Sequence, residues 1–94
     1  FPERFSLSQN FPNPFNPTTT IHYDVPTESF TRLAVYDISG RLVRELVSEY
    51  QFPGYYSIFW DGLDILNRNV PSGIYFYTIE ANDFQDVKKM LLVK

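Results

Sequence analysis

The sequence predicts an all-β fold, an immunoglobulin-like antiparallel β-sandwich of about seven strands. Three observations predict it. Short segments alternate apolar and polar residues with a period of two. Pro, Gly, Asn and Asp recur between these segments about every eight to twelve residues, and no segment has a helical pattern long enough to form an isolated helix. An open barrel is the alternative that these observations leave.

The composition supplies enough apolar side chains for one small core. The chain has 94 residues, a length typical of a single domain, and 44% of them are hydrophobic and 18% aromatic. Because there is no cysteine, burial and not a disulfide must hold the sheets together, and thiol catalysis and thiolate metal sites are excluded. We therefore expect residues 1–94 to form one folded domain.

Charge and hydropathy exclude two classes of partner. Eight Lys and Arg oppose eleven Asp and Glu, so the formal net charge is −3 and the chain offers no basic field for nucleic acid. No apolar run approaches the roughly 20 residues that a membrane-spanning helix needs. The sequence predicts no nucleic-acid binding and no membrane span.

The first predicted strand follows a segment that cannot form a helix. Residues 1–17 hold four prolines and three asparagines, and each proline pushes the residue before it toward an extended conformation. Ile21, Tyr23 and Val25 then alternate with polar residues. This alternation predicts a half-buried strand, which Pro26 ends.

A hairpin is predicted next. Residues 31–38 are rich in β-branched and aromatic side chains, and residues 42–47 form a second apolar segment after a turn at Ser39 and Gly40. Gly40 supplies the positive φ that such a turn requires. Residues 42–47 would also fit a helical stripe, but the segment is too short for an isolated helix, so a strand is preferred.

A corner at Pro53 and Gly54 precedes the fourth long strand. Tyr56, Ile58 and Trp60 share one face of this strand, and their neighbours point to the other. An aromatic and an aliphatic residue thus accompany the only tryptophan. This face is predicted to belong to the core.

Two strands complete the chain. Residues 61–73 are mostly turn formers and are predicted to be a loop. Residues 73–81 are the most β-prone segment, and a turn at 82–83 leads to a last strand at 85–93. The side chains predicted to be largely buried are Ile21, Tyr23, Val35, Ile58, Trp60, Tyr75 and Tyr77.

Candidate residues for catalysis or metal binding are few. His22, the only histidine, falls on the polar face of a strand and is predicted to be exposed and without a role. The side chains of Asp61, Asp64, Asn67 and Asn69 offer the oxygens that calcium prefers, but their spacing does not match the twelve-residue calcium loop, and turn formation explains them. The sequence therefore predicts no enzyme, no metal and no cofactor.

Exposed aromatic rings leave one alternative function open. Nine Phe, seven Tyr and one Trp exceed what a small core can bury, so Tyr50, Tyr55 or Phe59 is expected at the surface. Such rings would suit the sugar-stacking face of a non-catalytic carbohydrate-binding module. Packing in the core, however, accounts for most of these aromatic rings without any role in sugar binding.

Several motifs occur in a fixed order along the chain. Residues 7–21 read LSQNFPNPFNPTTTI and residues 35–41 read VYDISGR. A Trp-Asp-Gly corner at residues 60–62 precedes PSGIYFY at residues 71–77, and the chain closes with KKMLLVK. Together these motifs closely resemble the type A C-terminal sorting domain of type IX secretion substrates and its relative, the Ig-like domain of the flagellar hook-capping protein. The resemblance spans residues 7–94.

The resemblance implies a role in protein export. It implies a covalently attached upstream cargo domain, passage through the periplasm of a gram-negative bacterium, and recognition by the outer-membrane type IX translocon. The surface peptidase of the system is then expected to remove the domain or to exchange it for a surface anchor, so that the cargo is secreted or held at the cell surface. A hook-cap-like structural module is the alternative on the same fold.

The motifs fall on two groups of residues. The structural group consists of Pro12, Asn13, Pro14, Phe15, Gly40, Gly54, Trp60, Asp61, Gly62, Gly73 and Tyr75. The recognition group is the terminal motif, Lys88, Lys89, Met90, Leu91, Leu92, Val93 and Lys94. We expect the strand that carries the terminal motif to complete the sandwich and also to offer an unpaired edge, protected by exposed lysines, to a receptor that binds by β-augmentation.

Overall fold

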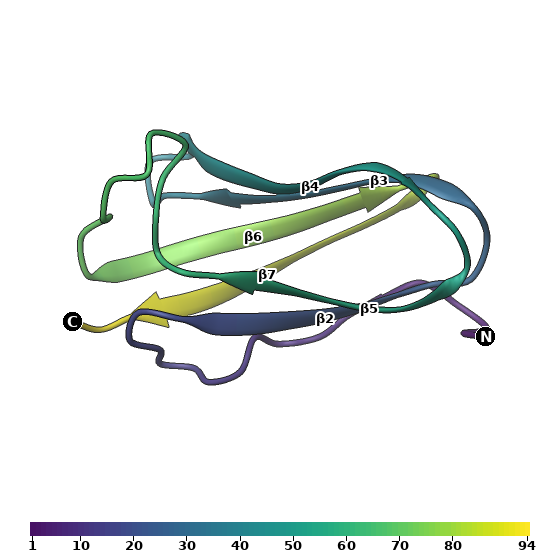
Figure 1. Cartoon of the computed structure of the whole chain (residues 1–94), viewed down its shortest axis with the longest axis horizontal. Coiled ribbons are helices and arrows are strands. Elements are labelled where there is room, and N and C mark those ends of the chain that lie inside the picture. Colours follow the sequence, from purple (N-terminus) through teal and green to yellow (C-terminus); the bar gives the residue numbers. More distant parts are fainter.

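The computed structural model describes residues 1–94 and contains seven strands and no helix (Figure 1). The strands are β1 (Ser6–Leu7), β2 (Thr19–Val25), β3 (Ser29–Tyr36), β4 (Leu42–Gln51), β5 (Gly54–Trp60), β6 (Gly73–Ala81) and β7 (Phe84–Leu92). They form two antiparallel sheets, ordered β1-β2-β5 and β4-β3-β6-β7. The predicted all-β sandwich is confirmed, and the alternative of an open barrel is excluded because the strands form two separate sheets.

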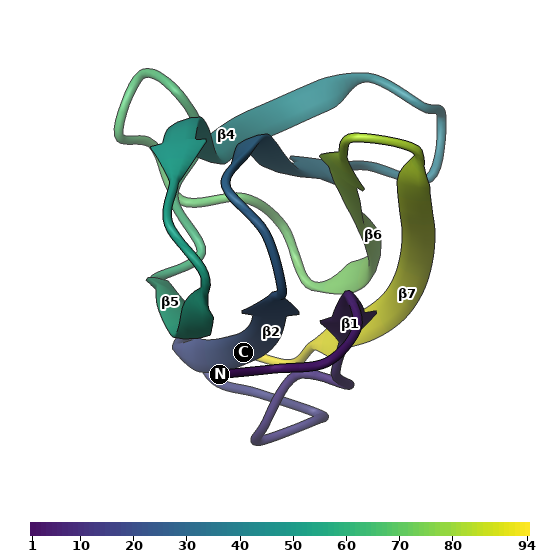
Figure 2. The same cartoon turned by 90° about the vertical axis from the view of Figure 1, so that its right-hand side faces the viewer.

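The end-on view shows the two sheets enclosing a common interior (Figure 2). The chain changes sheet three times, between β2 and β3, at the short turn between β4 and β5, and in the loop between β5 and β6. No helix of the structure is long and apolar enough to cross a membrane.

Side chains from both sheets form one core. Trp60 is 1% exposed, and its ring meets Tyr75 edge-on at a centroid distance of 5.6 Å. Each large buried ring contributes about 1.5 to 3 kcal/mol through the apolar surface that it removes from water. Six of the seven predicted core side chains are buried; Ile58 is the exception, half-buried and packed against the rim of the core.

The predicted hairpin forms with different ends. β3 is two residues earlier than expected, and β4 runs for ten residues, to Gln51, so the strand reading of residues 42–47 is confirmed and the helix is excluded. Irregularities in the register interrupt the pairing of β3 with β4 at Leu33/Ala34 and at Val35/Tyr36. The last strand begins at Phe84 and ends at Leu92, one residue before the predicted bounds.

The N-terminal segment is more deeply integrated than its turn-rich composition suggests. Phe15 is 2% exposed, and its ring lies 5.7 Å from that of Trp60. Asn10 is also 2% exposed, and its side-chain amide donates to Thr19 Oγ1 at 3.0 Å, which satisfies a buried polar group. The stretch from Asn10 to Phe15 is therefore packed into the sandwich.

Candidate functional site

The three lysines of this acidic chain all lie within its last seven residues. β7 places Met90 (1% exposed) and Leu92 (0% exposed) in the core, whereas Lys89 and Leu91 point outward. The terminal motif is thus divided into two sets of side chains. One set stabilises the sandwich, and the other is available to a partner.

Lys88 does not share the exposure of Lys89. Its side chain lies on the same side of β7 as Met90, is 34% exposed, and comes within 4.0 Å of the Asp86 carboxylate. Lys89 and Lys94 are exposed and form no ion pair. The expectation of two exposed lysines on the strand was therefore wrong for Lys88, because strand alternation turns every second side chain inward.

The outer edge of β7 is partly covered, which corrects the expectation of an unpaired terminal edge. Residues 9–15 run alongside residues 89–93, on the side away from β6. The Gln9 side chain donates to the Lys89 carbonyl (2.7 Å), the Leu91 amide donates to Asn13 Oδ1 (3.0 Å), and Phe15 exchanges main-chain bonds with Leu91 (3.0 Å) and Val93 (2.9 Å). No other segment pairs with this edge at Gln85 or Val87.

The motif Pro12-Asn13-Pro14-Phe15 accounts for this covering segment. The Pro12 carbonyl accepts from Thr19 Oγ1 at 2.9 Å, which joins the segment to the start of β2. Asn13 and Phe15 then provide the bonds to β7. The segment connects β2 of one sheet with the edge strand β7 of the other, so its residues close one side of the sandwich.

The Trp-Asp-Gly corner packs against the same segment. Trp60 Nε1 donates to the Leu63 carbonyl at 3.0 Å, and the Asp61 carboxylate accepts from the Leu63 amide at 3.2 Å. Gly62 has a φ of 79°, and a Cβ there would lie 3.2 Å from the Pro17 carbonyl oxygen. Glycine is needed both for the backbone conformation and for the close approach.

The remaining structural residues begin or anchor strands. Gly54 starts β5, Gly73 starts β6, and Gly40, with a φ of 87°, lies in the turn between β3 and β4. The Tyr75 hydroxyl donates to the Pro71 carbonyl at 2.6 Å. These residues set backbone geometry and carry no reactive group.

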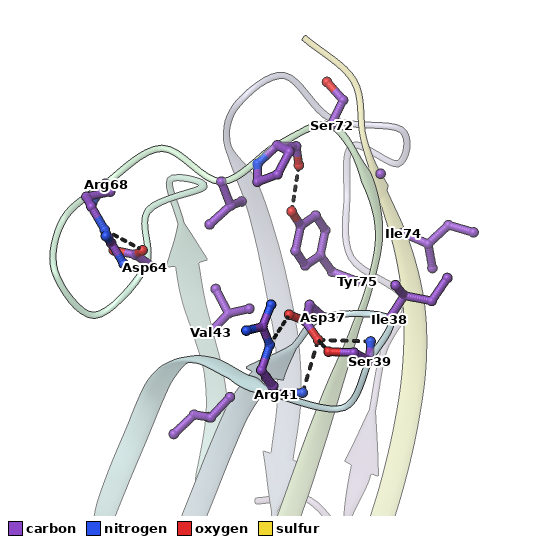
Figure 3. A pocket seen from close by; sticks show the side chains of 14 residues that line it. Asp37, Ile38, Ser39, Arg41, Val43, Asp64, Arg68, Ser72, Ile74 and Tyr75 are labelled. Atoms are coloured by element: carbon purple, nitrogen blue, oxygen red, sulfur yellow. Dashed lines mark hydrogen bonds and ion pairs between the residues drawn. The ribbon is translucent and has the colours of Figure 1, made fainter.

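Two equivalent five-residue turns, Asp37–Arg41 and Asp64–Arg68, flank a cleft of about 750 Å³ at one end of the sandwich (Figure 3). In each, the carboxylate accepts from the amides of the third and fifth residues, and the arginine Nε lies within 3.4 Å of it. Both turns have the sequence pattern Asp-Ile-x-x-Arg, which is the signal for them in the sequence.

These turns lower the pKa of both carboxyl groups. For Asp37 the main cause is the hydrogen bond from the Ser39 hydroxyl, and for Asp64 it is the bond from the Arg68 amide. Both carboxylates are thus committed to their own turns. The two structural turns account for the cleft between them, and the carboxylates of Asp37 and Asp64 are not free to bind a cation.

Neither candidate for catalysis or metal binding gains support. The structure has no group of three or more His, Cys, Asp or Glu able to hold a metal ion. His22 is exposed and lies opposite Ser57 in the register, but no hydrogen bond joins them, and Asp24 accepts from Ser6 instead. A nucleophile with its base is therefore not assembled here.

Comparison with known proteins decides the family. The sequence model of the secretion system C-terminal sorting domain matches residues 9–94, from the covering segment to the terminal lysine. The chain belongs to this family. No curated protein matches it.

Three solved structures share the fold of this sorting domain. Dimeric latent PorU from Porphyromonas gingivalis matches with a TM-score of 0.74 and 25% identity, over 90% of this chain and 9% of PorU. PorZ, an essential surface component of the type IX secretion system of the same organism, matches with a TM-score of 0.64 and 17% identity, over 96% of this chain and 11% of PorZ. FlgD from P. aeruginosa matches with a TM-score of 0.61 and 24% identity, over 79% of this chain and 57% of FlgD. PorZ and FlgD show the shared fold alone.

The family defines the function at a general level. Its domains are sorting signals of type IX secretion and are in general non-catalytic. This chain is therefore a sorting domain for export to the cell surface or the medium. It spans 9% of PorU and 11% of PorZ, a small part of each.

Proposed function

We propose that residues 1–94 form a single sorting domain that directs a covalently attached upstream cargo protein through the outer-membrane type IX translocon. The observation that carries this proposal is the family match over residues 9–94, which includes both the covering segment and the terminal motif. The cargo crosses the periplasm of a gram-negative bacterium. At the surface, the peptidase of the system removes the domain or exchanges it for an anchor.

Recognition is assigned to residues 88–94. Its support is the concentration of all three lysines there, in a chain whose net charge is −3. The structural group of residues, from Pro12 to Tyr75, holds this strand in place through the covering segment and the core. The domain itself needs no metal or cofactor and has no catalytic role in this proposal.

A reporter fusion tests the proposed function. The chain is fused to the C-terminus of a periplasmic reporter, in a host with a type IX system and in the same host without the translocon. Reporter in the medium or on the surface of the first host only is the expected result. The matched control carries the FlgD domain, which has the same fold. Export of both fusions, or of neither, would contradict a specific sorting role.

The exposed aromatic rings favour glycan binding as a second candidate. Tyr50, Tyr55 and Phe59 are 74%, 72% and 59% exposed, as expected for at least one of them, and Tyr55 and Phe59 lie on the same outer face of β5. Affinity electrophoresis through several polysaccharides tests it. Retardation that Tyr55→Ala abolishes would support this candidate, and unretarded migration would exclude it for the glycans used.

A further inference from the structure

The covered edge of β7 limits how a receptor can contact the terminal motif. β-augmentation requires free main-chain amides and carbonyls along the edge of a strand. At Leu91 both groups are already bonded, to Asn13 and Phe15, and the amide of Val93 is bonded to Phe15. A receptor strand could pair there only after displacing a segment whose Phe15 ring is 2% exposed. The outward side chains of the motif, those of Lys89, Leu91, Val93 and Lys94, are accessible without any such change.

Those outward side chains continue into a patch formed by three segments. Leu91 lies opposite Ile74 of β6 in the register, and Val93 follows Leu91 in the alternation. Ile38, in the turn after β3, lines the same cleft as Ile74, and both point toward the same side of β7 (Figure 3). All four side chains are exposed: Ile38 by 75%, Ile74 by 39%, Leu91 by 38% and Val93 by 45%.

We propose that the receptor of the sorting domain binds this aliphatic patch, Ile38, Ile74, Leu91 and Val93, through side chains and does not extend the sheet at the edge of β7. This inference rests on the proposed function and deepens it, because it names the surface that is recognised. The partner is a protein surface with an apolar centre and an acidic rim. Apolar centres with polar rims are the usual anatomy of specific protein interfaces.

The charges around the patch support an acidic partner. Lys89 and Lys94 flank it without ion pairs of their own, and the Lys94 amide is held by Ser72, next to the start of β6. The two acids of the adjoining cleft are bonded within their own turns, Asp37 to Ser39 and Arg41 and Asp64 to Arg68. The patch therefore presents a positive rim on an acidic domain.

The same charges disfavour two other occupants. A second copy of this chain, docked through the same patch, would bring its own lysines against these, and like charges across an interface are unfavourable. An anionic membrane would attract the rim but repel the remainder of a domain whose net charge is −3. A separate protein with complementary charge fits the surface best.

Substitutions that place the same new side chain inside and outside the patch test the proposal. Leu91→Asp and Ile74→Asp alter the patch on two different strands, and Val87→Asp is the matched control, since Val87 is 55% exposed on the same outer face of β7. In the reporter fusion, we expect the exported fraction to fall at least tenfold for the two patch variants and less than twofold for Val87→Asp and for the conservative Leu91→Met. Thermal melting of each domain identifies any variant that does not fold.

A further variant separates side-chain recognition from edge pairing. Asn13→Ala frees the Leu91 amide, so edge pairing predicts more export, whereas recognition of the patch predicts a change of less than twofold. Increased export, or patch variants that fold and export like Val87→Asp, would overturn the proposal. If the unaltered fusion is not exported, the proposed function itself fails.

The alternative occupants have their own measurements. Sedimentation of the purified domain would detect a dimer, and flotation with phosphatidylglycerol vesicles would detect membrane binding. Either association, if Leu91→Asp abolished it, would overturn the assignment of the patch to a receptor protein. A monomer that does not bind vesicles supports it.

Discussion

Replacing Phe15 with alanine tests whether the N-terminal segment is a structural part of the sandwich. The Phe15 side chain is 2% exposed, and its ring centroid lies 5.7 Å from that of Trp60. The main chain of Phe15 forms a parallel β-bridge with Leu92. Truncating a buried phenylalanine costs about 3 to 5 kcal/mol. A domain of this size has a total stability of roughly 5 to 14 kcal/mol, so the loss is a large fraction of it.

Thermal and urea denaturation of the 94-residue chain measure the effect. At about 4 to 8 °C per kcal/mol, the melting temperature is expected to fall by at least about 12 °C. Phe11→Ala is the matched control, because Phe11 lies in the same segment but is 76% exposed, and its loss is expected to stay within about 0.5 kcal/mol. If the two variants differ by less than about 1 kcal/mol, the packing of this segment against the core is refuted.

Three further predictions concern buried or constrained groups. Burial raises the pKa of Tyr77 to about 12 from 10.0, so the contribution of Tyr77 to the free energy of unfolding should be constant below pH 10 and be lost between pH 10 and 12. Tyr77→Phe should reduce the fall in stability over that range, measured by urea denaturation. Gly62→Ala should lower the melting temperature more than Gly40→Ala, because both have positive φ but only Gly62 has a main-chain oxygen 3.2 Å from the added Cβ; equal losses would contradict this. Hydrogen bonds lower the pKa of Asp37 and Asp64 below its ordinary value of 3.8. The contribution of these two carboxylates to stability should therefore be present above pH 3.8 and disappear as the pH falls through the lowered pKa values. NMR titration midpoints at or above 3.8 would contradict this.

The glycan and sorting candidates depend on different faces of the molecule. Tyr55 and Phe59 lie on the outer face of the β1-β2-β5 sheet, and the aliphatic patch lies at one end of the other sheet. Substitutions at one face therefore leave the other intact. The two activities can be measured separately on the same chain.

Local pattern was sufficient for the strands, because the side-chain period of a β-strand depends only on neighbouring residues. The alternation around Tyr23, Trp60 and Tyr77 placed these rings in the core correctly. The same alternation also indicates that Lys88 and Lys89 point to opposite sides of β7. Ile58 is less buried than its pattern suggests, because it packs at the rim of the core.

The sequence by itself determined the all-β class, most of the core, the glycine-dependent turn at Gly40 and, through its motifs, the family. Only the tertiary structure decided that Phe15 bridges to Leu92, that the edge of β7 is covered over residues 89–93, and that Ile38 and Ile74 lie near the terminal motif. These contacts join residues that are far apart along the chain. Periodicity and turn chemistry act over a few residues, so they cannot specify which distant segments meet when the two sheets close around one core.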